Sequence, residues 1–202
     1  MRSFPAGRAC AYIPRIYDVS VGRVKGRLSD HFDPRRGVVN LSDATYGDDS
    51  VAAVAVAAHE IGHVVQKERG YIPYKIRTAL VPVTNFGARL ALPLVLVGLL
   101  LDIFVNATSA SSVGFYLAVA GVVLYGLSTL FTLVTLPVEL DASRRAKKML
   151  LEEGILAEDE KKGAGKVLSA AALTYVAALL TSLVYFLRFA VWVFALFGRR
   201  RD

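Results

Sequence analysis

Two histidines and a glutamate lie within five consecutive residues, His59-Glu60-Ile61-Gly62-His63. In a helix, residues four positions apart project from the same face, so both imidazole rings would point to one place. This is the spacing at which two ligands on adjacent turns bind a single tetrahedral zinc ion. The run therefore predicts a Zn2+ site held by His59 and His63.

Glu60 lies beside the two histidines, where its carboxylate can reach a water on the metal without binding the metal itself. Zinc lowers the pKa of such a water towards about 7. Glu60 would take its proton as general base and later pass it to the leaving amine. This arrangement is typical of metalloproteases. The alternative is a buried helix in which His59, Glu60 and His63 each have a separate hydrogen-bond partner.

A catalytic zinc usually has three protein ligands and keeps one position for water, so a third ligand must come from elsewhere. His31 is the only other histidine, and the remaining candidates are carboxylates. Glu139 directly follows an apolar segment, and two membrane crossings between His63 and Glu139 would return the chain to the same side. We therefore predict Glu139 as the third metal ligand. Alternatively, Glu139 and Asp141 are acids that stabilise a helix N-terminus.

The segment that carries the histidines is predicted to be a buried helix over residues 50–69. It is rich in alanine and apolar on nearly every side, which is typical of a helix inside a protein. Asp49 or Ser50 is suited to cap its first turn, and Gly70 to end it. Gly62 would keep the face of the helix open.

Two short strands are predicted before this helix. Residues 19–28 alternate loosely in polarity and residues 37–42 are mostly apolar, with a turn at 30–36, so we predict a hairpin-like pair. With the helix, the strands would form a small zincin-like α+β domain over residues 1–78. In zincins an edge strand pairs with the extended substrate. Residues 38–41 are either such a strand or a plain hairpin strand.

The second half of the chain is too apolar for a soluble protein. Hydrophobic residues make up 54% of the chain, and its mean hydropathy is +0.46. Residues 88–105 and 113–136 are each long enough to cross a hydrocarbon core of roughly 30 Å, which predicts two transmembrane helices within 79–136. The apolar stretch 167–197 is too long for a simple span. Residues 167–202 are therefore predicted to form a long C-terminal helix, or a transmembrane helix and a basic tail.

Charge indicates the orientation in the membrane. Residues 137–166, the predicted cytoplasmic segment with the third ligand, and the part before residue 80 are both rich in Lys and Arg. The polar loop at 106–112 has neither. The positive-inside rule therefore places both basic regions, and the site, in the cytoplasm. The tail Arg199-Arg200-Arg201 argues the other way if the last apolar stretch crosses once.

Other features of the composition exclude some classes of protein. The net charge of +7 is the ordinary bias of a cytoplasmic membrane face, and no basic stripe interleaved with aromatic residues predicts a nucleic-acid partner. The single cysteine, Cys10, excludes an internal disulfide and a multi-cysteine zinc site. Residues 1–21 contain Pro5 and Pro14 and no apolar core, so no cleavable signal peptide is predicted.

The sequence resembles the YugP-type neutral zinc metallopeptidases, which are multi-pass membrane proteins of bacteria. The resemblance rests on five stretches, at residues 28–46, 50–73, 77–94, 137–146 and 170–183. It implies zinc, endopeptidase activity and a bacterial plasma-membrane location, and it supports Glu139 as third ligand.

Glu139 also resembles the third ligand of HtpX-type membrane peptidases, in which a Glu-x-x-x-Asp pattern is usual. Here the residue four positions after Glu139 is Ser143. The carboxylate that would orient a ligand imidazole is therefore missing from that position, and Asp141 is the candidate substitute.

Three further residues have two interpretations each. Arg144 or Arg145 could stabilise an oxyanion, although anchoring at the membrane interface is the commoner role of such residues. His31 either lies near the metal site or is a turn histidine held by Asp30 or Asp33, and we favour the second interpretation.

These features predict a mostly α membrane protein, with a zincin-like domain on two to three transmembrane helices. Its predicted function is zinc-dependent cleavage of peptide or protein substrates, such as membrane or unfolded proteins, with membrane lipid as its other partner. One alternative is a metal-binding membrane scaffold or chaperone-like adaptor, which would have no use for Glu60. Another is a transporter, although the apolar segments contain few ionisable residues, among them Asp102 and Arg188.

Overall fold

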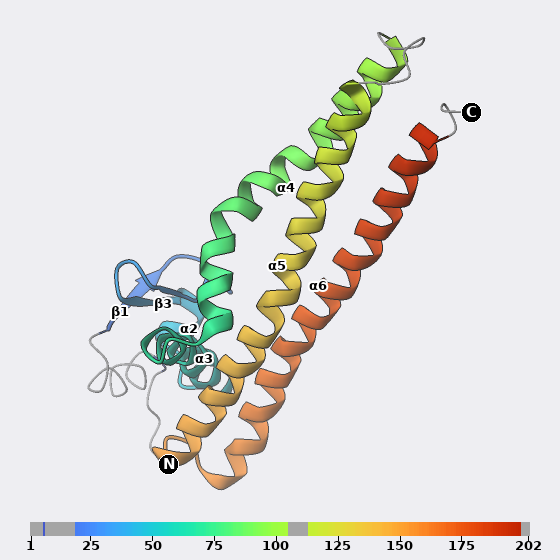
Figure 1. Cartoon of the computed structure of the whole chain (residues 1–202). Coiled ribbons are helices and arrows are strands. Elements are labelled where there is room, and N and C mark those ends of the chain that lie inside the picture. Colours follow the sequence, from blue (N-terminus) through green and yellow to red (C-terminus); the bar gives the residue numbers. More distant parts are fainter. Residues whose placement is uncertain (1–5, 7–18, 105–112, 199–202) are drawn as a thin grey trace. The chain divides into compact units, whose positions relative to one another are not determined.

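The computed structural model describes residue 6 and residues 19–104 and 113–198 (Figure 1). The predictions made for the loop at 106–112 and for the tail at 199–201 lie outside these residues, as do most of those made for the N-terminal segment. The chain divides into two compact units.

Each unit is built from two stretches of the chain. The first unit contains Met1–Lys75 and Pro137–Thr174, and the second contains Ile76–Leu136 and Tyr175–Asp202. Residues of the predicted metal site, 59–63 and 139, all belong to the first unit. Helices α4 (Ile72–Phe104), α5 (Val113–Glu152) and α6 (Glu158–Gly198) each contribute residues to both units.

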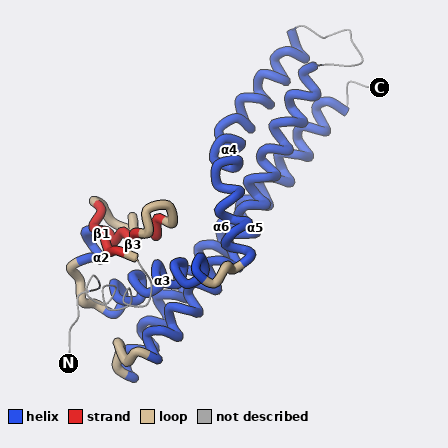
Figure 2. Tube along the Cα trace, turned by 60° about the vertical axis from the view of Figure 1, so that its left-hand side comes forward, coloured by secondary structure: helices blue, strands red, loops and turns tan. Residues whose placement is uncertain are grey.

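A three-stranded sheet forms part of the first unit (Figure 2). Its strands are β1 (Ser20–Val24), β2 (His31–Asp33) and β3 (Val38–Ser42), in the order β1-β3-β2. Strand β3 pairs in parallel with β1 and antiparallel with β2. The predicted hairpin between the first and last strands is therefore wrong, because these two strands run in the same direction.

The hairpin forms instead between β2 and β3, and β2 lies inside the segment 30–36 that we predicted to be a turn. The backbone N–H of Gly37 donates to the carbonyl of Asp33 at 3.0 Å, and Gly37 has a positive φ of 65°, which glycine adopts without strain. Strand β3 is consequently the central strand. Of the two interpretations of residues 38–41, the edge strand for substrate is therefore wrong, because both sides of β3 are already paired, and the hairpin strand is confirmed by the antiparallel pairing with β2.

Helix α3 (Val51–Glu68) has the predicted ends. The Ser50 hydroxyl accepts a hydrogen bond from the Ala53 N–H at 3.2 Å and so caps the first turn. Gly70 follows the helix with a φ of 64°, the left-handed conformation that commonly ends a helix. The short helix α2 (Asp43–Tyr46) connects the sheet to α3.

The core of the first unit lies between α3, the sheet and the parts of the long helices that belong to this unit. Twelve of the eighteen residues of α3 are buried, as the apolar pattern predicted. They pack with buried residues of β3 and of the segments 137–174, among them Val39, Leu41, Ala146, Leu150 and Leu168. The helix with the histidines is thus held on several sides, which fixes the positions of its side chains.

Three long helices follow α3. They are α4 (Ile72–Phe104), α5 (Val113–Glu152) and α6 (Glu158–Gly198), and in the described residues all three are long and apolar enough to cross a membrane. Each extends well beyond its predicted apolar span, because the adjoining polar residues continue the helix without a break. A mostly α membrane protein with a small α+β domain is therefore confirmed.

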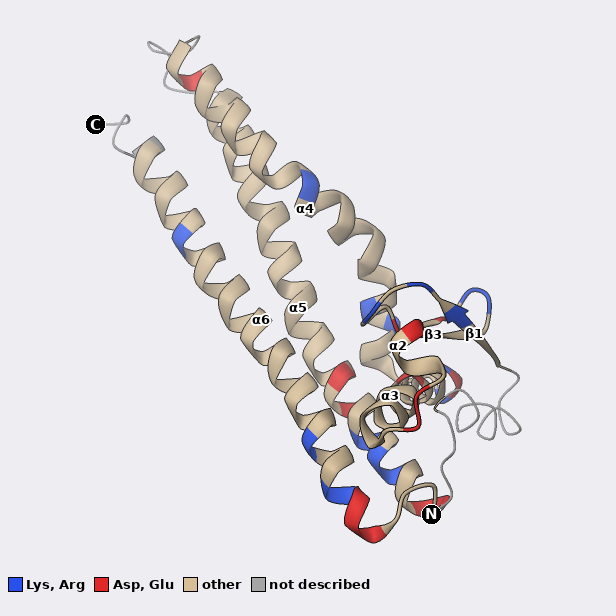
Figure 3. Cartoon of the chain, turned by 180° about the vertical axis from the view of Figure 1, so that it is seen from behind, with Lys and Arg blue, Asp and Glu red and all other residues tan. Residues whose placement is uncertain are grey.

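The second unit carries little charge (Figure 3). Among its described residues, the charged ones are Arg77, Arg89, Asp102 and Arg188. Its buried cluster is small and apolar, made by Val95, Ala118, Val122 and Val193. Large apolar side chains instead cover the outside of these helices, which suits contact with lipid rather than water.

Candidate metal centre

The candidate metal centre lies where α3 contacts α5. At this contact, Gly62 lies so close to the backbone of Ala142 that a Cβ on residue 62 would lie 2.5 Å from the Ala142 carbonyl oxygen. We had predicted that Gly62 keeps this face of the helix open. This prediction is wrong, because the backbone of α5 fills the space. Because Gly62 has no side chain, the backbones of α3 and α5 can come into contact at Gly62 and Ala142.

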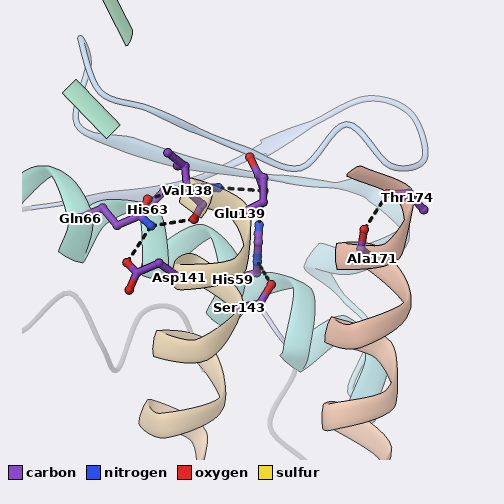
Figure 4. Close-up of polar contacts among 9 residues, drawn as sticks. All are labelled: His59, His63, Gln66, Val138, Glu139, Asp141, Ser143, Ala171 and Thr174. Atoms are coloured by element: carbon purple, nitrogen blue, oxygen red, sulfur yellow. Dashed lines mark hydrogen bonds and ion pairs between the residues drawn. The ribbon is translucent and has the colours of Figure 1, made fainter. Parts of the chain in front are cut away.

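Three predicted ligands meet at this contact (Figure 4). Glu139 Oε2 lies 3.0 Å from His59 Nε2 and 3.6 Å from His63 Nε2. The two imidazole rings are nearly perpendicular, with centroids 4.9 Å apart. Glu139 is 1% exposed, although it is a carboxylate, and His63 is also buried. A buried carboxylate between two histidines is rarely stable without a bound cation or protons.

The spacing of the donor atoms fits a zinc ion. Four ligands at about 2.0–2.1 Å in a tetrahedron lie about 3.3 Å from one another. The two distances from Glu139 Oε2 to the histidine Nε2 atoms bracket this value, and all three donors lie within 4.8 Å of one another. Two imidazoles and one carboxylate are also a donor set that a catalytic zinc accepts.

Glu60 lies next to this group without belonging to it. Among the described residues, the group that could hold a metal contains His59, His63 and Glu139, and Glu60 is not part of it. Glu60 is also buried. Burial raises the pKa of its carboxyl above the usual value, and the nearby His63 and His59 act in the opposite direction. A carboxyl with a raised pKa in such a place is suited to accept a proton.

The other ring nitrogens of the two histidines are held by polar side chains. His59 Nδ1 lies 3.1 Å from the hydroxyl of Ser143, so the serine contacts the imidazole from the position that an aspartate occupies in the Glu-x-x-x-Asp pattern. His63 Nδ1 lies 2.9 Å from Gln66 Oε1. The predicted substitute, Asp141, contacts Gln66 and not a histidine.

Sequence reasoning overlooked Gln66. It is the only glutamine in the chain, and it follows His63 by three positions, after the apolar pair Val64 and Val65. Residues three apart on a helix are neighbours, so a polar side chain there could have been identified as a partner of His63.

The remaining candidates lie away from the donor group or serve other contacts. His31 is exposed on strand β2, with Nδ1 2.8 Å from the Ser29 carbonyl oxygen and Nε2 3.2 Å from Asn40 Nδ2. The prediction that Asp30 or Asp33 holds it is therefore wrong. Arg145 donates to Asp141 at 2.6 Å. Arg145 therefore forms an ion pair with Asp141, a neighbour of the donor group.

The fold and the donor group together describe a membrane protein with a His, His, Glu group that could hold a metal ion. The chain belongs to the family described as "Putative neutral zinc metallopeptidase", whose match covers residues 8–194. It is similar to the "Putative membrane protease YugP" of Bacillus subtilis (strain 168), with 44% identity over 176 residues, which are 87% of this chain and 73% of the relative. No solved structure matches the chain.

Proposed function

We propose that the chain is a membrane-bound zinc metalloendopeptidase, with His59, His63 and Glu139 as ligands and Glu60 as general base. The observation that carries this proposal is the group of three donors, with His63 and Glu139 buried and His59 partly buried, whose distances from Glu139 Oε2 suit zinc, with the buried carboxyl of Glu60 beside it. Membership of a family described as zinc metallopeptidases supports it.

In this proposal the residues divide the chemistry between them. Bound zinc would supply a Lewis acid that polarises the peptide carbonyl and makes water more acidic. His59, His63 and Glu139 would hold the ion and leave a position for water or substrate. A Glu60 carboxylate oxygen would accept a proton from the attacking water and then donate it to the nitrogen of the leaving amine. Burial of the site excludes bulk water and strengthens these interactions.

The proposed substrates are peptide bonds of membrane or unfolded proteins, at the cytoplasmic face of a bacterial plasma membrane. The orientation rests on the Lys and Arg content before residue 80 and in 137–166. Three helices that could cross a membrane support multi-pass insertion, with lipid around the second unit. The alternative, a metal-binding scaffold without turnover, would not need Glu60 beside the ligands.

Removal of the metal tests the proposal directly. We expect the full chain, purified in detergent with zinc, to cleave a casein-type substrate, and cleavage to fall to background after treatment with 1,10-phenanthroline. Added zinc should restore the activity, because the three donors remain in place. The measurement is release of fluorescent fragments together with the zinc content of each sample. Cleavage that persists in zinc-free protein would contradict the proposal.

The third ligand has its own test. Glu139→Ala is expected to weaken zinc binding more than about 100-fold, because even the loss of a residue that only orients a ligand costs 10- to 100-fold. His31→Ala, which removes the remaining histidine of the chain, should leave the zinc affinity unchanged. Zinc affinity is measured by competition with a chromophoric chelator, and circular dichroism checks that both variants are folded. Equal zinc affinities of the two variants would show that Glu139 is not a metal ligand.

A further inference from the structure

The side chain of Gln66 is completely buried, with 0% exposure, and has three hydrogen-bond contacts. One of its terminal atoms lies 2.7 Å from the carbonyl oxygen of Val138 and 2.9 Å from Asp141 Oδ2. The Val138 carbonyl oxygen can only accept a hydrogen bond, so this terminal atom must be the amide nitrogen. The other terminal atom is then the oxygen Oε1, and it faces His63.

This orientation determines which nitrogen of His63 carries hydrogen. Gln66 Oε1 can only accept, so His63 Nδ1, at 2.9 Å, must donate. In a neutral imidazole the hydrogen on Nδ1 leaves Nε2 with a free lone pair. Nε2 is the atom that lies 3.6 Å from Glu139 Oε2, in the donor group. Gln66 thus favours the tautomer that a metal at this site requires.

Asp141 and Arg145 in turn hold Gln66. Asp141 Oδ2 accepts from Arg145 Nε at 2.6 Å as well as from Gln66, and the Asp141 side chain is only 14% exposed. The guanidinium of Arg145 also lies 5.7 Å from the ring centroid of Tyr71, close enough for a cation–π contact. A continuous set of contacts therefore links Arg145, Asp141 and Gln66 to His63.

We propose that Gln66 is a positioning residue of the metal centre, and that Asp141, fixed by Arg145, sets the orientation of the Gln66 amide. Together they fix the ring of His63 in the tautomer whose Nε2 can bind metal. This inference rests on the metal site of the proposed function. It assigns the orienting role for His63 to an amide held by a carboxylate, whereas Ser143 has the corresponding contact with His59.

The first test removes the hydrogen bonds and keeps the volume. Gln66→Met places a side chain of similar length in the same space without a donor or strong acceptor. We expect the zinc dissociation constant of the full chain in detergent to rise about 10- to 100-fold, the usual cost of losing a residue that orients a metal ligand. In the metal-free protein, the ¹⁵N chemical shifts of the His63 ring should show a mixture of tautomers, where the unaltered chain shows hydrogen on Nδ1.

The second test exchanges donor and acceptor. Gln66→Glu can still accept from His63 Nδ1, but its second oxygen would face Val138 O and the carboxylate of Asp141, and the like charges repel. Zinc binding should therefore weaken. Adding Asp141→Asn to this variant replaces the repelling carboxylate with an amide that can donate to the new carboxylate at position 66. A charge-assisted hydrogen bond of this kind should recover about tenfold in zinc affinity. A residue that merely filled space would give no such recovery.

Val64→Ala is the matched control. Val64 is fully buried on the same helix and belongs to the apolar core, so its truncation destabilises the fold without touching His63 Nδ1. Its zinc affinity should equal that of the unaltered chain, although its melting temperature falls. An unchanged zinc affinity and an unchanged tautomer in Gln66→Met would overturn the positioning role and leave the proposed hydrolysis standing. If the unaltered chain bound zinc but cleaved no substrate, the proposed hydrolysis would be wrong and the positioning role of Gln66 would stand.

Discussion

Glu60→Gln is expected to lower the rate of peptide hydrolysis about 10²- to 10⁴-fold, the usual contribution of a general base, while zinc remains bound. Glutamine has almost the same shape as glutamate and fits the same buried space, so the fold should survive. Its amide cannot accept the proton of the attacking water at neutral pH. Because Glu60 is outside the group of metal donors, the ion should not be lost with the carboxylate.

The decisive measurement compares turnover and zinc content in the same preparations. Glu68→Gln is the matched control. Glu68 belongs to the same helix but is exposed, and its substitution changes the charge by the same amount. It should leave both quantities unchanged. If Glu60→Gln cleaved the substrate at the rate of the unaltered chain, the proposed mechanism with Glu60 as general base would be wrong. Loss of zinc from Glu60→Gln would instead make Glu60 a ligand.

The sequence was sufficient for those parts of the site that depend on spacing along one helix. His59 and His63 lie four apart, and an Ala-rich helix with a serine cap and a terminal glycine holds them, as expected. Glu139 could be predicted as the third ligand because the two apolar segments between His63 and Glu139 would return the chain to the same side of the membrane. The structure places its carboxylate between the two imidazoles.

What the sequence did not reveal depends on contacts between segments far apart in the chain. The parallel pairing of β1 with β3 places β2 on the opposite edge, and no local pattern in such short strands distinguishes this arrangement from a simple hairpin. The roles of Gln66 and Ser143 could not be assigned either. Each is a polar residue with many possible partners until α3 and α5 are brought together.

Gly62→Ala is expected to hinder assembly of the site, although it removes no metal ligand. Alanine is the better helix former, by roughly 1 kcal/mol, so helix propensity alone would make this change stabilising. Its Cβ, however, would lie 2.5 Å from the carbonyl oxygen of Ala142 and 3.0 Å from its Cα. These are backbone atoms that cannot rotate away. Helices α3 and α5 would therefore have to separate.

Separation of these helices acts directly on the metal centre, because His59 and His63 are on α3 and Glu139 is on α5. Zinc binding would have to restore the close approach against a strain of about 1–3 kcal/mol, which corresponds to a rise of about 5- to 150-fold in the zinc dissociation constant. Gly47→Ala is the control, since Gly47 has a φ of −102° and a Cβ there would meet nothing within 4 Å. Chelator competition on both variants measures the difference. A zinc affinity in Gly62→Ala equal to that of Gly47→Ala would mean that the close approach of α3 and α5 does not set the spacing of the ligands.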